Sequence, residues 1–292
     1  MNQTPQPGIL AEVPPQARHV SFQIADAGDV ARALQALREQ ADGEGVVVGI
    51  GLAACAALGV NIPGLSAGPV IAGSRVELPC QPVALWLWLR GQDRGELLHR
   101  ERRLEQLLAP AFQRQHSVES FRHDGGRDLT GYEDGTENPD GEAALAAACV
   151  GEGALAGSSY VAVQQWLHDF DGFERMPGSE QDDAIGRRRS DNEELEDAPE
   201  SAHVKRTAQE DFAPEAFLLR RSMPWTAGHR GGLMFVAFGH SLAAFEAQLT
   251  RMSGAEDGVV DALFRFTRPI NGHYAWCPTL RDGRLELAPL GL

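Results

Sequence analysis

The sequence predicts an α+β protein made of two ferredoxin-like halves. Strand–helix–strand followed by strand–helix occurs in the first half of the chain, and the second half repeats this order. Duplicated units with this order are typical of ferredoxin-like folds. The 292 residues suffice for one large domain or two modest ones, and either can bury a hydrophobic core.

The first half opens with a half-buried strand at 18–24, where apolar and polar residues alternate. Apolar residues at helical spacing over 30–37 predict a helix, which Asp26 or Asp29 can cap. The remaining elements predicted for this half are strands at 46–51 and 83–89 and a helix over 97–108. The strand at 83–89 is a continuous apolar run, so we expect neither of its faces to meet solvent.

The second half repeats these elements, with strands predicted at 159–166 and 232–238 and an apolar helix starting at Ser241. Residues 171–215 are polar and weakly periodic. A long irregular loop inside a compact domain is usually disordered or functional, and His203 near its end favours function.

Glycines cluster at 140–155, where we place the division between the halves. The predicted units are an N-terminal domain, 1–150, and a C-terminal domain, 151–292.

The formal net charge of −15 disfavours nucleic acids and anionic membrane surfaces as partners, because both repel an acidic protein. The sequence contains no run of about 18 apolar residues, so we expect no membrane span. No secretory signal is recognised near the first residues, so we expect a cytoplasmic protein. The four cysteines lack Cys-x-x-Cys spacing, which favours free thiols over a disulfide framework.

The most specific local pattern is the loop Gly131–Pro139, built around the carboxylate of Asp134. Its glycines permit backbone conformations closed to other residues, and Asn138-Pro139 stops a helix and fixes the exit. Such restriction suggests a side chain aimed at a ligand. The alternative is a surface turn in which Asp134 caps backbone N–H groups. The loop alone favours this alternative, since Asp-Gly is common turn chemistry.

The pattern Gly-x-x-Asp-Gly-Thr at 131–136, followed by Glu137-Asn138-Pro139, resembles the signature of the dye-decolourising haem peroxidases, and the chain resembles their bacterial B-type branch. The resemblance implies two ferredoxin-like halves of the dimeric α+β barrel type, with haem b between the sheet and helices of the C-terminal half. Further blocks resembling this family, in family order and spacing, are Ala184–Arg187, Ser201–Arg206, Leu218–Pro224, Gly231–Phe235 and Asp261–Pro269.

By this resemblance His203 is the axial ligand of the haem iron. A haem peroxidase needs a base, usually a neutral imidazole, on one face of the iron, and leaves the other face open. Without the resemblance His203 is more often a surface or structural histidine. The rivals are His229, His240, which we expect to help begin a helix, and His273, which we expect in a turn. They show no recognisable spacing for a non-haem metal site.

The resemblance makes Asp134 and Arg220 the catalytic pair on the open face. Asp134 takes a proton from peroxide, so it should be ionised at rest, and a positive charge stabilises the departing hydroxide. Without the resemblance Arg220 would be a surface arginine on a strand. Ser222 is expected on the same strand face as Arg220. Relatives often carry asparagine there, so the third polar contact would come from a shorter hydroxyl.

Four further cofactor-binding expectations follow from the resemblance. Leu233 and Phe235 alternate on a strand and would limit access to the distal haem face, although core packing also explains them. Arg187 is a candidate for a haem propionate; the alternative is a loop arginine paired with solvent or Asp191. Asp261 is a candidate acceptor for the second nitrogen of the axial histidine; the alternative is a solvated acid on a helix.

The implied reaction is haem-dependent reduction of hydrogen peroxide through a ferryl intermediate, with oxidation of organic donors such as dyes and phenols. Bulky donors would react at the surface or haem edge. An alternative is a haem-binding or haem-handling protein with incidental peroxidase activity, and a third is a ferredoxin-like small-molecule binder without haem. Relatives form dimers and larger assemblies, so we expect a homo-oligomer. Encapsulation in a protein nanocompartment is possible but not favoured, because the tail after the last family-like block is short.

Overall fold

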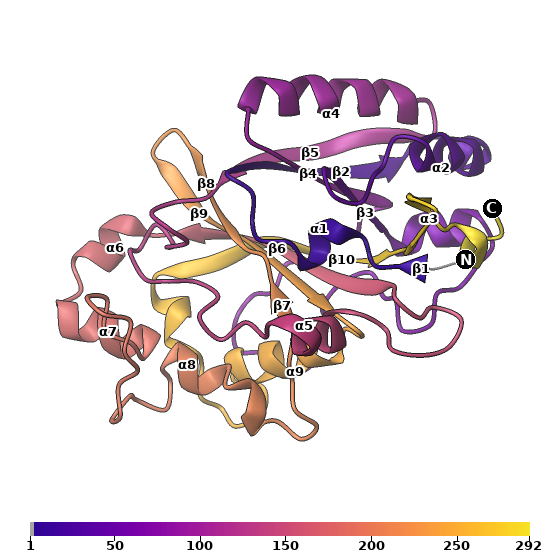
Figure 1. Ribbon diagram of the computed structural model, residues 1–292. Helices are drawn as coiled ribbons and strands as arrows, with labels where there is room; N and C mark the ends of the chain where they lie inside the picture. The colour runs from indigo at the N-terminus through magenta and orange to yellow at the C-terminus, as the bar shows by residue number, and fades with distance from the viewer. Residues whose placement is uncertain (1–2) are drawn as a thin grey trace.

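The computed structural model describes residues 3–292, and its main feature is one nine-stranded sheet (Figure 1). The strand order is β5-β2-β4-β3-β10-β6-β9-β7, and β8 pairs with β9. All the pairs are antiparallel. In sheet order the strands are β5 (Phe112–Phe121), β2 (Gln16–Ile24), β4 (Leu85–Gly91), β3 (Val46–Ile50), β10 (Thr267–Cys277), β6 (Ser159–His168), β9 (Arg230–Gly239), β7 (Leu219–Arg220) and β8 (Met223–Ala227).

The two halves of this sheet have the same topology. Counted along the chain, the four strands of the first half, β2 to β5, lie in the order 4-1-3-2, and so do β6, β7, β9 and β10 of the second half. Strand β3 joins β10 through the pair Ile50 and Trp276. The order 4-1-3-2 is that of a ferredoxin-like unit, so the predicted α+β fold is confirmed. The division into domains near 140–155 stays a prediction.

Helices cover the outer faces of both halves (Figure 1). In that view α2 and α4 lie above the strands of the first half, and α8 and α9 lie below those of the second. The helices are α1 (Pro7–Leu10), α2 (Val30–Arg38), α3 (Leu52–Ala57), α4 (Arg94–Leu108), α5 (Gly141–Ala148), α6 (Phe170–Glu174), α7 (Gly178–Ile185), α8 (His203–Arg206) and α9 (Ala243–Met252). A small sheet joins β1 (Gln3–Thr4), β11 (Leu280–Arg281) and β12 (Arg284–Leu285).

Strand β4 explains how the core is divided. Leu87 belongs to the cluster that packs under α2 and α4, whereas Trp86 and Trp88 belong to a second cluster between the two halves. The ring centroids of Trp86 and Trp88 lie 6.4 and 6.2 Å from that of Phe238 on β9. Because both faces of β4 are covered, its continuous apolar sequence is expected for a strand without a solvent-facing side.

Three local expectations were wrong. Residues 171–215 contain short helices, α7 and α8 among them, instead of one irregular loop. His273 lies in β10 and is buried, not in a turn, because the strand continues through it in register with Val163 of β6. Ser222 falls between β7 and β8, outside either strand. Within residues 3–292, no helix combines the length and apolarity needed to cross a membrane.

Candidate functional site

A cavity of about 920 Å³, its open mouth included, lies in the second half of the molecule. It brings together residues far apart in the sequence, from the loop at 131–139, from α8, and from strands β7 and β9. Five of the eight predicted site residues line the cavity: Asp134, His203, Arg220, Leu233 and Phe235.

His203 is the first residue of α8, and its imidazole is held from behind. Its Nδ1 lies 2.8 Å from Oδ2 of Asp261, which is 1% exposed. The other carboxylate oxygen of Asp261 accepts a hydrogen bond from the Leu263 N–H at 2.8 Å. An ionised carboxylate only accepts hydrogen bonds, so this contact places the ring proton on Nδ1 and leaves a lone pair on Nε2. The imidazole is therefore prepared to act as a ligand.

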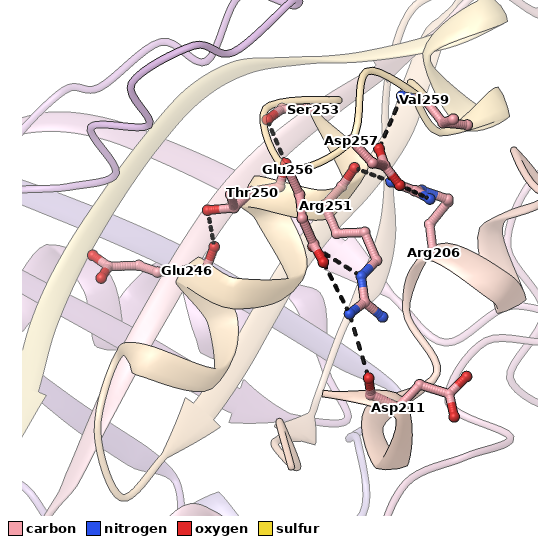
Figure 2. Close-up of polar contacts among 9 residues, drawn as sticks. All are labelled: Arg206, Asp211, Glu246, Thr250, Arg251, Ser253, Glu256, Asp257 and Val259. Carbon is pink, nitrogen blue, oxygen red and sulfur yellow. Dashed lines mark hydrogen bonds and ion pairs between the residues drawn. The ribbon is translucent and has the colours of Figure 1, made fainter. Parts of the chain in front are cut away.

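A buried arginine anchors α8 to the segment after α9 (Figure 2). Arg206, 3% exposed, donates from Nη1 and Nη2 to the two carboxylate oxygens of Asp257, each at 2.8 Å, and from Nη2 to the Arg251 carbonyl at 2.8 Å. The hydrogen bond from Arg206 holds the pKa of Asp257 below its usual range. Arg251 in turn pairs with Glu256 at 3.0 Å. Bidentate pairs of this kind fix geometry, and here they fix the helix that carries His203.

The loop with Asp134 is bonded directly to the strand with Arg220. The side-chain amide of Asn138 donates to the Arg220 carbonyl at 3.1 Å and accepts from the Arg220 N–H at 2.8 Å. Gly131 and Gly135, with φ of 89° and 78°, provide the left-handed conformations that turn the loop. The predicted catalytic pair is therefore held by one connected set of hydrogen bonds.

The sequence analysis missed a buried acid–histidine pair in the cavity wall. His168, at the end of β6, lies with Nε2 3.0 Å from Oδ1 of Asp128 and Nδ1 2.7 Å from the Thr267 hydroxyl. Both the N–H and hydroxyl of Thr130 donate to Oδ2 of Asp128, at 3.0 and 2.6 Å. Burial favours the neutral form of Asp128, but the hydrogen bonds from His168 and Thr130 outweigh it and hold its pKa below its usual range.

The alternation of side chains along β6 could have identified His168 as a cavity residue. Gln164, Trp166 and His168 alternate along this strand, and all three line the cavity. Asp128 carried no comparable signal, because an acid six residues before Asp134 in a glycine-rich stretch resembles ordinary turn chemistry.

Apolar side chains complete the walls. Phe235 on β9 and Phe245 on α9 have ring centroids 5.8 Å apart, and both face the cavity. Leu249, Met252 and Leu263 add further apolar surface. A cavity with apolar walls and few convergent polar groups suits a large flat ligand that needs orientation.

Three predicted site residues do not line this cavity: Asp261, which lies behind His203, and Arg187 and Ser222. Arg187 donates from Nη2 to Glu137 at 2.6 Å and to Glu194 at 3.1 Å. Asp191, its expected alternative partner, pairs with Arg188 instead. Ser222 lines an adjacent chamber, where its hydroxyl accepts a hydrogen bond from the Val236 N–H at 3.4 Å. The roles expected for Arg187 and Ser222 stay predictions.

The donor set fits a haem iron better than a free metal ion. Among residues 3–292, no group of three or more histidine, cysteine or acidic side chains is arranged to hold a metal ion. His203 offers one imidazole nitrogen to the cavity, and an anionic acceptor stands behind that ring. One nitrogen donor beside apolar walls is what a haem group requires, because the porphyrin supplies the other ligands. Asp134 and Arg220 add charge at the same cavity.

Comparison with known proteins gives concordant results. Residues 125–282 match the family model described as "Dyp-type peroxidase, C-terminal". A dye-decolorizing peroxidase of Mycolicibacterium paratuberculosis is 31% identical, over 94% of this chain and 84% of that protein. The structure of a dye-decolorizing protein from V. cholerae matches with a TM-score of 0.84 and 27% identity, over 99% of both chains. A variant of Rhodococcus jostii RHA1 DypB in complex with heme matches with a TM-score of 0.83 and 23% identity, over 92% of this chain and 94% of that one.

Proposed function

Because this chain belongs to the Dyp-type peroxidase family, it is a peroxidase, and we propose that His203 binds haem b in the cavity for the reduction of hydrogen peroxide with organic donors. The observation that supports this most directly is the hydrogen bond from His203 to buried Asp261, which leaves Nε2 free at the cavity wall. The related DypB structure contains heme. Membership of the B-type branch stays a prediction.

When bound, haem supplies the redox chemistry, accepting two oxidising equivalents from peroxide and passing them singly to reductants. The residues of the protein position and polarise the reactants. Asp261 fixes the orientation of the His203 ring, since its carboxylate accepts the hydrogen bond from Nδ1. The apolar side chains of Leu233 and Phe235 restrict the open side to small oxidants, so bulky donors react at the haem edge or the surface.

Asp134 and Arg220 handle the proton and the charge in the proposed reaction. The carboxylate of Asp134 accepts a proton from peroxide and returns it to the departing oxygen. The guanidinium of Arg220 stabilises negative charge on that oxygen. The two hydrogen bonds between the Asn138 side chain and the Arg220 backbone support this pairing, because they tie the loop that carries Asp134 to the strand that carries Arg220.

An absorption spectrum of the purified protein, before and after one equivalent of peroxide, tests the proposal. We expect a Soret band that changes on peroxide addition and returns when a phenol is added. A colourless protein that does not take up hemin would contradict haem binding and favour the small-molecule binder.

The haem-handling alternative is distinguished by turnover. It requires His203 but no charged pair on the open side, so it predicts the same slow peroxide reaction in the wild type and in Arg220→Leu. A fast wild-type reaction that Arg220→Leu slows would exclude it. A homo-oligomeric state and a cytoplasmic location stay predictions, and so does the view that encapsulation is possible but not favoured.

A further inference from the structure

A second chamber adjoins the haem cavity. It has a volume of about 880 Å³, its open mouth included. Asp128, Asp134, Arg220 and Leu233 line both spaces, so they form a shared wall. The catalytic pair therefore faces a second compartment that the proposed peroxide chemistry does not explain.

The part of this chamber beyond the shared wall is rich in positive charge. Arg122, Arg127 and Arg221 line it, together with the acid Glu12. Arg127 pairs with Glu133 at 2.8 Å. By contrast, within residues 3–292, no carboxylate lies within 4.0 Å of the side-chain nitrogens of Arg122, Arg220 or Arg221. Three arginines in one chamber without a carboxylate in contact with their side chains are unexpected in a chain of net charge −15.

Arg221 shows the imbalance most clearly. Its guanidinium donates to the carbonyls of Ile9, Leu10 and Arg220 at 3.2, 2.7 and 3.1 Å. A guanidinium has five N–H donors, so two remain for a ligand. Burial, and then the nearby Arg90, lower the pKa of Arg221 to about 10, although Glu12 acts in the opposite direction. Arg221 is still cationic at neutral pH. A partly buried cation without a counter-ion is stabilised by an anion that enters the site.

Further groups make the chamber suitable for an organic anion. The Ser222 hydroxyl accepts from the Val236 N–H, so its own proton is free to be donated. Met223, Pro224 and Leu233 provide apolar surface. Two of the three acids of the chamber, Asp128 and Asp134, stand on the shared wall, where they repel an anionic group, and the third, Glu12, faces more arginines than acids on its side of the chamber. The charged end of a ligand is therefore favoured near Arg122 and Arg221, with its uncharged ring toward the haem cavity.

We propose that this chamber binds the carboxylate or sulfonate group of an aromatic donor, through Arg122, Arg221 and Ser222. The inference rests on the proposed function and adds the charge class of the reductant. The local positive charge attracts such donors to one face of an otherwise acidic protein. The ring of a donor held there lies beside the shared wall, where its electron can pass to the haem site.

A matched pair of phenols tests the anion site directly. 3-(4-Hydroxyphenyl)propanoate and its amide share the same ring and chain and differ in charge. Calorimetric titration of the haem-loaded protein without peroxide should show the carboxylate binding at least tenfold more tightly than the amide, since hydrogen bonds to a charged group are stronger than those to a neutral group. Equal affinity for the two phenols would overturn the proposal.

Substitutions then locate the site. Arg122→Gln and Arg221→Gln should each weaken carboxylate binding about tenfold and leave amide binding unchanged. Arg102→Gln on α4 removes an exposed charge that does not line the chamber and should change neither. Arg122 is exposed, so its variant should fold even if loss of Arg221 does not allow folding. Unchanged carboxylate affinity in Arg122→Gln would contradict the assignment.

Turnover separates this inference from the proposed function. In the Arg122→Gln variant, KM for the carboxylate phenol should rise about tenfold while kcat changes little, and both constants for the amide should stay the same. Selective carboxylate binding without any peroxide turnover would support the anion site and remove the proposed function. Rapid turnover with equal affinity for both phenols would retain the peroxidase and remove the anion site.

Discussion

The two halves of the sheet have the same strand order, but one is filled and the other is hollow. In the first half, the connection from β2 to β3 is short and carries α2, whose Leu34 and Leu37 are 1% and 0% exposed against the sheet. In the second half, the connection from β6 to β7 spans residues 169–218 and contains α6, α7 and α8. Its last helix carries His203 to the cavity rather than an apolar side chain into a core.

The difference shows how one topology supports two uses. An amphipathic helix packed along a strand pair leaves no space for a ligand. A long connection with three short helices does not cover the sheet in this way, and an ion pair between Arg206 and Asp257 holds α8 instead (Figure 2). The cavity is therefore a consequence of the connection, not of the strands.

The largest expected effect is the loss of haem when the imidazole of His203 is removed from the hollow half. His203→Ala should abolish haem retention, because the protein then offers no axial nitrogen. The ratio of Soret to 280 nm absorbance measures this loss, and added imidazole should partly restore it. His229→Ala, which removes an exposed histidine in the β8–β9 turn, is the matched control. Normal haem loading in His203→Ala would exclude the ligand assignment.

Next in size is the effect on the peroxide reaction. Asp134→Ala or Arg220→Leu should slow the peroxide-induced change of the Soret band by a factor of ~10² or more, the range for lost acid–base or electrostatic assistance. Stopped-flow absorbance measures this rate. Asp124→Ala removes an exposed acid near the same loop and should leave the rate unchanged. Wild-type rates in both active-site variants would contradict the proposed mechanism.

A pair of leucines tests the difference between the filled and hollow halves. Leu37→Ala in the filled half should lower the free energy of unfolding by about 2–5 kcal/mol, because it creates a void in a close-packed core. Leu233→Ala should cost less in the haem-free protein, since that side chain already borders the cavity. Urea denaturation of both variants gives the comparison, and equal losses would show that the two halves are packed alike.

A smaller effect on the haem site is expected from changing Asp261, the acid that accepts a hydrogen bond from His203. Asp261→Asn retains an acceptor for His203 but removes its negative charge, so the haem reduction potential should rise and activity should fall by about 10–100-fold. Spectroelectrochemical titration measures the potential. Asp257→Asn weakens the anchor of α8 without altering the acceptor of His203, and it should leave the potential nearly unchanged. A similar shift of the reduction potential in both variants would show that Asp261 has only a structural role.

The smallest effect concerns pH and the pair of Asp128 and His168. The pKa of Asp128 is lowered in the folded state, so its contribution is present above the unfolded pKa of about 3.9 and is lost as the pH falls through the folded value. The stability difference between wild type and Asp128→Asn should be about 1 kcal/mol at pH 7 and should shrink below pH ~4. Denaturant titrations from pH 7 downward test this, with exposed Asp124→Asn as control. A difference independent of pH would exclude the ionic contribution.

The parts of the site that were predictable from sequence are those with a local pattern. The glycines around Asp134 and the alternation of Leu233 and Phe235 are readable one segment at a time, and both segments line the cavity. The family blocks located His203 and Arg220 although neither has a distinctive neighbourhood of its own. Arg187 was less predictable, because its partners Glu137 and Glu194 are set by how two loops meet.

By itself, the order of apolar and polar residues determined the α+β class, the repeated ferredoxin-like halves and the helices that cover them, because periodicity and capping act over a few residues. Tertiary structure alone decided which half would be hollow, how Asp128 meets His168, and that three arginines line one chamber without a carboxylate in contact with their side chains. These features depend on contacts between segments up to about two hundred residues apart, and no local pattern records such contacts.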